Sequence, residues 1–170
     1  MQILPTVFVV AVAITHTVPF DERPRRSEAV AVTAVADGDT ITVAKYGRVR
    51  LLGIKAPELG RGSTTAAPFA QEARDRLSEL VLHRWVRLEH DGGRFDEHRR
   101  QPAYVFREDG TFINGELVRD GLARVAASAP LARLDELKRA EAEARSFRRG
   151  MWGSAPRVPR PGYTRDPAQP

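Results

Sequence analysis

Apolar residues in the middle of the chain follow two periods, and these predict its secondary structure. Short valine-rich segments separated by turn residues are typical of β-hairpins, and apolar positions three and four residues apart are typical of amphipathic helices. Strands are expected at 29–36, 41–43, 49–54, 85–89 and 103–106, and helices at about 69–81, 114–122 and 131–149. Short strands followed by helices in this order predict a small five-stranded barrel capped by helices.

The two ends of the chain lack this pattern. The first 20 residues hold an apolar run, Val7–Ile14, which is too short to span a membrane but fits the apolar part of an export signal. A buried strand is the alternative, because the run is rich in valine. Beyond residue 153 the chain is rich in Pro and Arg, which predicts a flexible tail. We expect a signal peptide and linker at 1–28, a folded domain at 29–153 and a tail at 154–170, with no transmembrane segment in the mature protein.

Composition narrows the chemistry. The 170 residues include no cysteine, which excludes disulfides, thiolate metal sites and cysteine nucleophiles. Four scattered histidines do not have the spacing of a metal site, so a metal ion would be held by oxygen atoms. The net charge of +5 and the pI near 10.2 favour an anionic partner, such as nucleic acid or a membrane surface.

Two polar clusters carry the candidate chemistry. The first joins the turn at 37–40 to the segment 50–58, and the second spans 96–104. Each holds carboxylates and an arginine. Carboxylates bind hard cations, a glutamate can deprotonate water, and arginines stabilise charge that develops on a phosphate. The combination favours binding and cleavage of a phosphodiester.

On these residues the sequence resembles the staphylococcal nuclease (thermonuclease) family. The resemblance runs from about Ala29 to Gly153, through segments at 35–40, 49–58, 96–105, 117–123 and 141–152. It implies an OB-fold barrel with three helices. It also implies a calcium-assisted nuclease that acts on DNA, RNA or both with little sequence preference.

The resemblance further implies roles for individual residues. Two arginines, Arg50 and Arg100, match those that contact the scissile phosphate, and Glu58 matches the general base for the attacking water. Asp39 matches a calcium ligand, and Ala56 stands where the family offers a backbone carbonyl to the metal. Asp37 and Asp96 match acidic positions near the site whose roles are less direct.

Three departures from the family pattern modify these expectations. Lys55 replaces the usual second metal-binding aspartate, so calcium binding should be weak. Arg99 replaces a common glycine and adds a cation to the nucleic-acid contacts of Arg50 and Arg100. The aromatic residues of the family's nucleotide pocket are missing at Ala127 and Ala129, and His98 stands where tyrosine is common, so little base recognition is expected.

Other interpretations remain open at this stage. The chain is alternatively a catalytically silent OB-fold module that binds single-stranded nucleic acid or a protein partner, and Lys55 favours that view. A barrel with no role in nucleic-acid binding is a third interpretation. The expected location is outside the cell or in the cell envelope, and otherwise the cytoplasm. A monomer is expected.

Overall fold

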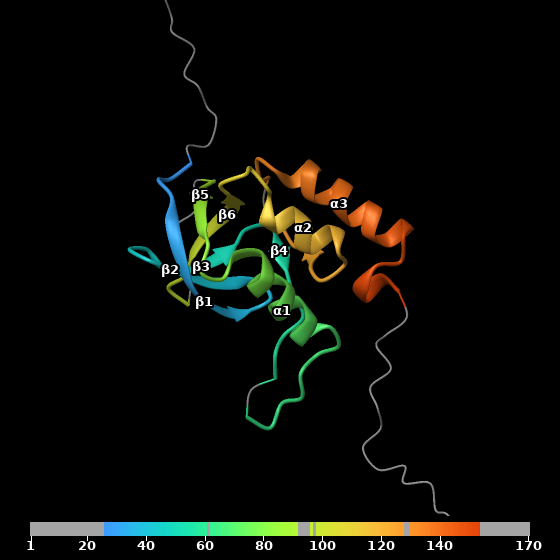
Figure 1. Cartoon of the computed structure of the whole chain (residues 1–170). Helices are drawn as coiled ribbons and strands as arrows, with labels where there is room; N and C mark the ends of the chain where they lie inside the picture. Colours follow the sequence, from blue (N-terminus) through green and yellow to red (C-terminus); the bar gives the residue numbers. More distant parts are fainter. Residues whose placement is uncertain (1–25, 61, 92–95, 97, 128–129, 154–170) are drawn as a thin grey trace, which may run out of the picture.

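The computed structural model describes residues 26–60, 62–91, 96, 98–127 and 130–153 (Figure 1). The expected export segment, apart from residues 26–28 of its linker, and the expected tail at 154–170 lie outside the described residues. The elements in chain order are the strands β1 (Val30–Asp37), β2 (Thr40–Val43), β3 (Gly47–Leu51) and β4 (Ile54–Lys55), helix α1 (Ala70–Val81), strands β5 (Trp85–Glu89) and β6 (Gln101–Arg107), helix α2 (Ile113–Arg119), strand β7 (Arg124–Val125), helix α3 (Leu134–Ser146) and a short 3-10 helix (Gly150–Trp152).

Five strands close into a barrel in the order β1-β2-β3-β6-β5, which confirms the predicted fold. All neighbours are antiparallel except β3 and β6, which pair in parallel with Val49 beside Gln101. Alternate residues of each strand point into the barrel, as the period of two predicts. The interior side chains that are fully buried include Val32, Ile41, Val43, Val49, Leu51, Val86, Leu88 and Val105.

The described residues form three α-helices, which lie to one side of the barrel (Figure 1). Helix α1 packs on β1, and helix α2 lies between β6 and α3. The apolar face of α1 is buried as the helical spacing predicts. None of the helices in the described part of the chain is long and apolar enough to cross a membrane.

The strand expected at 49–54 is in fact two strands. Strand β3 ends at Leu51, and β4 pairs separately with β7, which the sequence did not predict. Gly53 causes the break, because its φ of +77° belongs to the left-handed region and a Cβ there would lie 2.7 Å from Leu137. The side chain of the buried Asn114 holds this bend by donating a hydrogen bond to the carbonyl of Leu52.

The last helix is shorter than expected. It ends at Ser146 rather than Arg149, because Arg148 has a left-handed φ of 51° that interrupts the helical backbone. Phe147, which lies within the helix range expected from the sequence but beyond the actual end of the helix, is 67% exposed. Helix α2 likewise ends at Arg119, three residues earlier than expected.

The segment before β1 is attached to the barrel. Arg26 forms an ion pair with the buried Glu89, and its guanidinium lies 3.8 Å from the centre of the Phe106 ring. The hydroxyl of Ser27 accepts a hydrogen bond from the backbone N–H of Leu88. The folded unit thus includes residues that the sequence assigned to a linker.

Candidate active site

Asp39, in the turn between β1 and β2, is the most enclosed carboxylate of the candidate site. Its side chain is 10% exposed. The carboxylate lies 3.0 Å from the Arg50 guanidinium and accepts hydrogen bonds from the Ala56 N–H at 2.8 Å and from the Thr40 hydroxyl at 3.3 Å. Burial raises the pKa of Asp39 to about 6, although the Arg50 charge and the Ala56 hydrogen bond act in the opposite direction.

The turn is shaped by the two residues before Asp39. The carboxylate of Asp37 accepts a hydrogen bond from the backbone N–H of Asp39 at 3.0 Å, as Asx turns do. A Cβ at Gly38 would lie 2.7 Å from the Cβ atoms of Ala56 and Ala73. Glycine therefore lets the turn approach both α1 and the segment after β4, which brings Asp39 to Ala56.

Arg50, on the outer side of β3, is held by the backbone around it. Its guanidinium donates hydrogen bonds to the carbonyls of Leu51 at 3.0 Å and Ile54 at 2.9 Å, in addition to the ion pair with Asp39. Burial lowers the pKa of Arg50, and the nearby Arg100 charge acts in the same direction. Two like charges are thus held close together, which is a suitable arrangement for binding an anion.

Arg100 reaches the same face from the segment that precedes β6. Its Nε donates to the Asp96 carboxylate at 2.8 Å, and its Nη1 donates to the Thr40 hydroxyl at 3.2 Å. Partial burial acts to raise the pKa of Asp96, but hydrogen bonds from Arg100 and His98 outweigh it and hold that pKa below its usual value. Asp96 therefore fixes the position of Arg100.

Arg99 lies in this turn with an exposed side chain and a φ of 56°. This left-handed conformation suits glycine and is strained for arginine. The backbone thus gives a physical reason why glycine is common here in the family that the sequence resembles.

Lys55 and Glu58 form an ion pair beside these residues. The Nζ atom of Lys55 lies 2.8 Å from Oε1 of Glu58, with the two side chains 44% and 78% exposed. Ala56 lies between them in the chain, and its N–H is the group that contacts Asp39. The pair therefore flanks the enclosed carboxylate, with Glu58 open to solvent.

Thr40 is a site residue that sequence reasoning missed. Its fully buried side chain joins Arg100 to Asp39, and Asp39 joins Arg50, so both arginines belong to one continuous row of polar contacts. The sequence did contain a feature that points to Thr40, because this residue completes the turn Asp-Gly-Asp-Thr at 37–40. Its linking role requires β3 and β6 to be neighbours, which the sequence alone does not establish.

The sequence profile described as "Staphylococcal nuclease homologue" matches residues 48–154, which is more than half of the chain. The chain belongs to the staphylococcal nuclease family. It is 32% identical to a thermonuclease of Staphylococcus hyicus over 72% of this chain and 75% of that protein. It is 34% identical to a thermonuclease of Staphylococcus intermedius over 75% and 77% of the two chains. It is also 32% identical to the endonuclease YncB of Bacillus subtilis over 85% and 71%.

The oxygen donors of this staphylococcal nuclease homologue fit a weak cation site. Asp39 is enclosed and oxygen-bearing, as a hard cation requires. However, Arg50 and the Ala56 N–H already engage its carboxylate, and Lys55 introduces a positive charge one residue before Ala56. In the described residues no group of three or more His, Asp and Glu side chains is placed to hold a metal ion.

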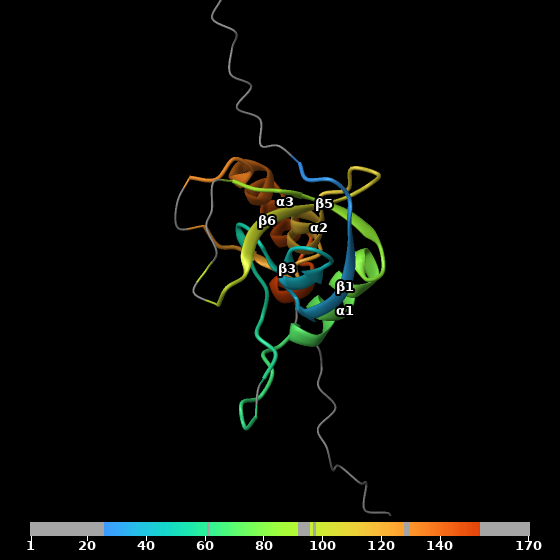
Figure 2. The ribbon, with the colours of Figure 1, turned by 90° about the vertical axis from the view of Figure 1, so that its left-hand side faces the viewer.

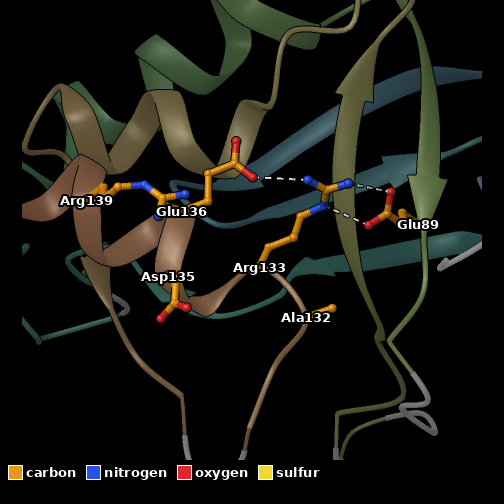
Figure 3. Close-up of a pocket in the computed structure, with 6 residues that line it drawn as sticks. All are labelled: Glu89, Ala132, Arg133, Asp135, Glu136 and Arg139. Atoms are coloured by element: carbon orange, nitrogen blue, oxygen red, sulfur yellow. Dashed lines mark hydrogen bonds and ion pairs between the residues drawn. The ribbon is translucent and has the colours of Figure 1, made fainter. Parts of the chain in front are cut away.

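A separate cavity of about 240 Å³ lies between the start of α3 and the end of β5 (Figure 3). Arg133 crosses it, with its guanidinium bonded to Glu89 at 2.7 and 2.9 Å and to Glu136 at 3.0 Å. The charges of Arg133, Glu89 and Glu136 at this cavity are thus paired within the protein. None of the residues that line it is a predicted site residue, so we assign the cavity a structural role in attaching α3 to the barrel.

Proposed function

We propose that the protein is a nuclease that hydrolyses phosphodiester bonds of DNA, RNA or both with little sequence preference. The relatives named thermonuclease and endonuclease support this proposal, as does membership of the staphylococcal nuclease family. The observation that carries it is the row Arg100–Thr40–Asp39–Arg50, which places two arginines from distant parts of the chain on one face.

In this proposal Arg50 and Arg100 bind the scissile phosphate. Both guanidinium groups are held by protein partners before a substrate arrives. Prepositioned charges stabilise a transition state effectively, because little reorganisation is needed as negative charge develops. Exposed Arg99 adds a less specific contact with the nucleic-acid backbone.

Glu58 is the proposed general base. Its exposed carboxylate accepts a proton from a water molecule, the water oxygen attacks phosphorus, and the bond to the leaving oxygen breaks as that oxygen takes up a proton from solvent. The ammonium of Lys55, 2.8 Å from that carboxylate, places a further positive charge next to the reacting groups.

We propose calcium as the assisting cation, held by Asp39 and the backbone carbonyl of Ala56. When bound, the ion supplies positive charge to the phosphate. Lys55, at the position of the usual second aspartate, weakens this site rather than contributing a ligand. We further propose an export signal and linker within residues 1–28, a nuclease domain at 29–153, a flexible tail at 154–170, and a monomeric protein of the cell envelope or exterior.

A cleavage assay tests the proposed function. Single-stranded DNA and RNA are incubated with the protein and calcium, and then with a chelator in place of calcium. We expect cleavage of at least one strand type, stimulated by calcium. Binding without cleavage under both conditions would support the catalytically silent OB-fold module instead.

A further inference from the structure

The outer side of β3 forms a row that leads away from the candidate active site. Arg48 and Arg50 lie on the same side of the strand, since Val49 and Leu51 between and after them are buried in the barrel. In the β2–β3 ladder Arg50 lies opposite Thr40, and Arg48 lies opposite Thr42. Two residues along a strand cover about 7 Å, which is comparable with the spacing of successive phosphates in an extended single strand.

Exposed aromatic side chains lie at the far end of this row. Tyr46, at the tip of the β2–β3 hairpin, is 42% exposed, and Trp85, at the start of β5, is 57% exposed. Ala31 of β1 lies between them: it is the ladder partner of Trp85, and its carbonyl accepts a hydrogen bond from Ala44 at the base of the hairpin tip. The hairpin, β1 and the start of β5 are therefore side by side (Figure 2).

The charges around these aromatic rings are mostly positive. Lys45 and Arg48 lie on either side of Tyr46 in the chain, and both side chains are exposed. Arg84 and Arg87 lie on either side of Trp85 and are exposed as well. Neither Lys45 nor Arg48 forms an ion pair with any residue that the structure describes. The surface thus combines cations available to phosphates with rings available to bases.

We propose that Arg48, Lys45, Tyr46 and Trp85, here called the outer strip, bind single-stranded nucleic acid and guide it to Arg50. The inference rests on the proposed nuclease function and extends it to substrate class. Arg48 and Lys45 bind phosphates next to the scissile one, and bases stack on Tyr46 and Trp85. Stacking on an aromatic side chain requires an exposed base face, which a duplex hides, so the strip selects single strands. Every base has such a face, so the strip does not distinguish one sequence from another.

Substrate length provides the first test. The kcat/KM values are measured for a thymidine dinucleotide and for a strand of about twenty thymidines, longer than the site of a typical OB fold. We expect Tyr46→Ala and Trp85→Ala each to lower the ratio of long-strand to dinucleotide kcat/KM by about tenfold. Phe147→Ala, which removes an exposed ring at the end of α3, is the matched control and should leave the ratio unchanged. An unchanged ratio in both aromatic variants would overturn the proposal.

Salt dependence tests the cationic part of the strip. Affinity for the long strand is measured with a chelator present, over a range of salt concentrations. Removing one phosphate contact from a single strand lowers the slope of log K against log salt by about 0.7. We expect that change for Arg48→Gln, and no change for Arg139→Gln, an exposed arginine on α3, a helix that packs on α2 and β7. Equal slopes for Arg48→Gln and wild type would contradict the role of Arg48.

Fluorescence tests the strip without any need for cleavage. In the Trp152→Phe protein, Trp85 is the remaining tryptophan. We expect saturable quenching by the thymidine strand and much weaker quenching by a duplex of equal length or by polyphosphate, which has no bases. Equal quenching by polyphosphate, or none by the thymidine strand, would overturn stacking on Trp85. Quenching by the thymidine strand in a protein that cleaves neither DNA nor RNA would support binding by the outer strip and would reject the proposed nuclease function.

Discussion

The ammonium of Lys55 lies 2.8 Å from the carboxylate of Glu58, so a fixed positive charge accompanies the proposed general base. A dissociable metal ion leaves when a chelator is added, whereas a lysine does not. The pair therefore affects how strongly the proposed cleavage reaction should depend on the proposed calcium ion.

Lys55→Asp should tighten calcium binding at least tenfold. The substitution replaces a repelling charge with an oxygen ligand, and even about 1.4 kcal/mol of improved binding free energy corresponds to a factor of ten. Calorimetric titration with calcium measures affinity, and strand cleavage is followed in parallel. Lys138→Asp, a lysine-to-aspartate change at an exposed position of α3, is the control for net charge. Tighter binding with faster cleavage would support the weakened site, and tighter binding with slower cleavage would assign Lys55 to the reaction. Unchanged affinity would contradict the position of residue 55 at the metal.

Glu58→Gln and Arg100→Ala should each lower kcat by about 10²-fold or more without unfolding the protein. Loss of a positioned base typically costs about 10²–10⁴-fold, and loss of one prepositioned charge costs about 10²–10³-fold. Glu72→Gln on α1 and Arg107→Ala at the end of β6 are controls with the same chemical changes. Thermal unfolding verifies the fold of each variant. Wild-type cleavage by both site variants would show that the active site is elsewhere.

Arg99→Gly should raise thermal stability and weaken substrate binding. The left-handed φ of 56° costs a non-glycine residue about 1–2 kcal/mol of folding free energy. The greater conformational freedom of glycine in the unfolded chain offsets about 0.4–1 kcal/mol of the stability gained by relieving this strain. A net stabilisation between about 0 and 1.6 kcal/mol is expected, with a higher KM for a long strand because a cation is lost. Chemical unfolding and steady-state kinetics measure the two effects. A destabilised Arg99→Gly protein would mean that the Arg99 side chain makes a stabilising contact.

The stability of the metal-free protein should depend on the protonation of Asp39. Burial raises the pKa of Asp39 from 3.8 to about 6, so the folded state keeps this proton to a higher pH than the unfolded chain. The contribution of Asp39 to the free energy of unfolding therefore falls as pH rises from about 4 to about 6. Relative to Asp39→Asn, the wild type should lose at most about 3 kcal/mol over this range. Denaturant unfolding with chelator present measures the difference. A wild type that gains stability over this range relative to the variant would show that Arg50, not burial, controls the Asp39 proton.

A protein that begins at Arg26 should unfold cooperatively and with nearly the stability of the full chain. Removing residues 26–28 as well should cost about 1–2 kcal/mol, because the buried Glu89 loses one of its two arginine partners. Denaturant titration compares the two truncated proteins. Insolubility of the longer truncated protein would instead favour a buried strand among the first 20 residues.

Much of the barrel was predictable because several of its strands place apolar residues at alternate positions that are buried in the interior. Val30 and Val32 of β1 and Val86 and Leu88 of β5 show this alternation, whereas the four residues 103–106 of β6 are all buried. The division of 49–54 into two strands was not predictable, since it depends on Gly53 approaching Leu137 of a distant helix. The exposure of Phe147 was missed for a related reason: the apolar period continues past the residue at which the helical backbone ends.

The candidate residues followed from motif resemblance, but their arrangement did not. Arg50 and Arg100 are 50 positions apart in the chain (100 − 50), and only the β3–β6 pairing shows that Thr40 connects them. The strain at Arg99 and the pairing of Lys55 with Glu58 likewise depend on the local backbone, which a list of residue types does not specify.

The parallel pairing of β3 with β6 also has a consequence for folding kinetics. The hairpins β1–β2 and β2–β3 join residues near in sequence, whereas Val49 and Gln101 are 52 residues apart (101 − 49). Pairing at long sequence separation forms slowly, since its loop-closure entropy is lost before the new contacts compensate. Arg50 lies in β3 one residue after Val49, and Arg100 lies one residue before Gln101, at the start of β6. The face proposed to be catalytic is therefore assembled by the slow closure of the barrel, and a chain whose hairpins alone have formed has secondary structure but lacks the proposed phosphate-binding site.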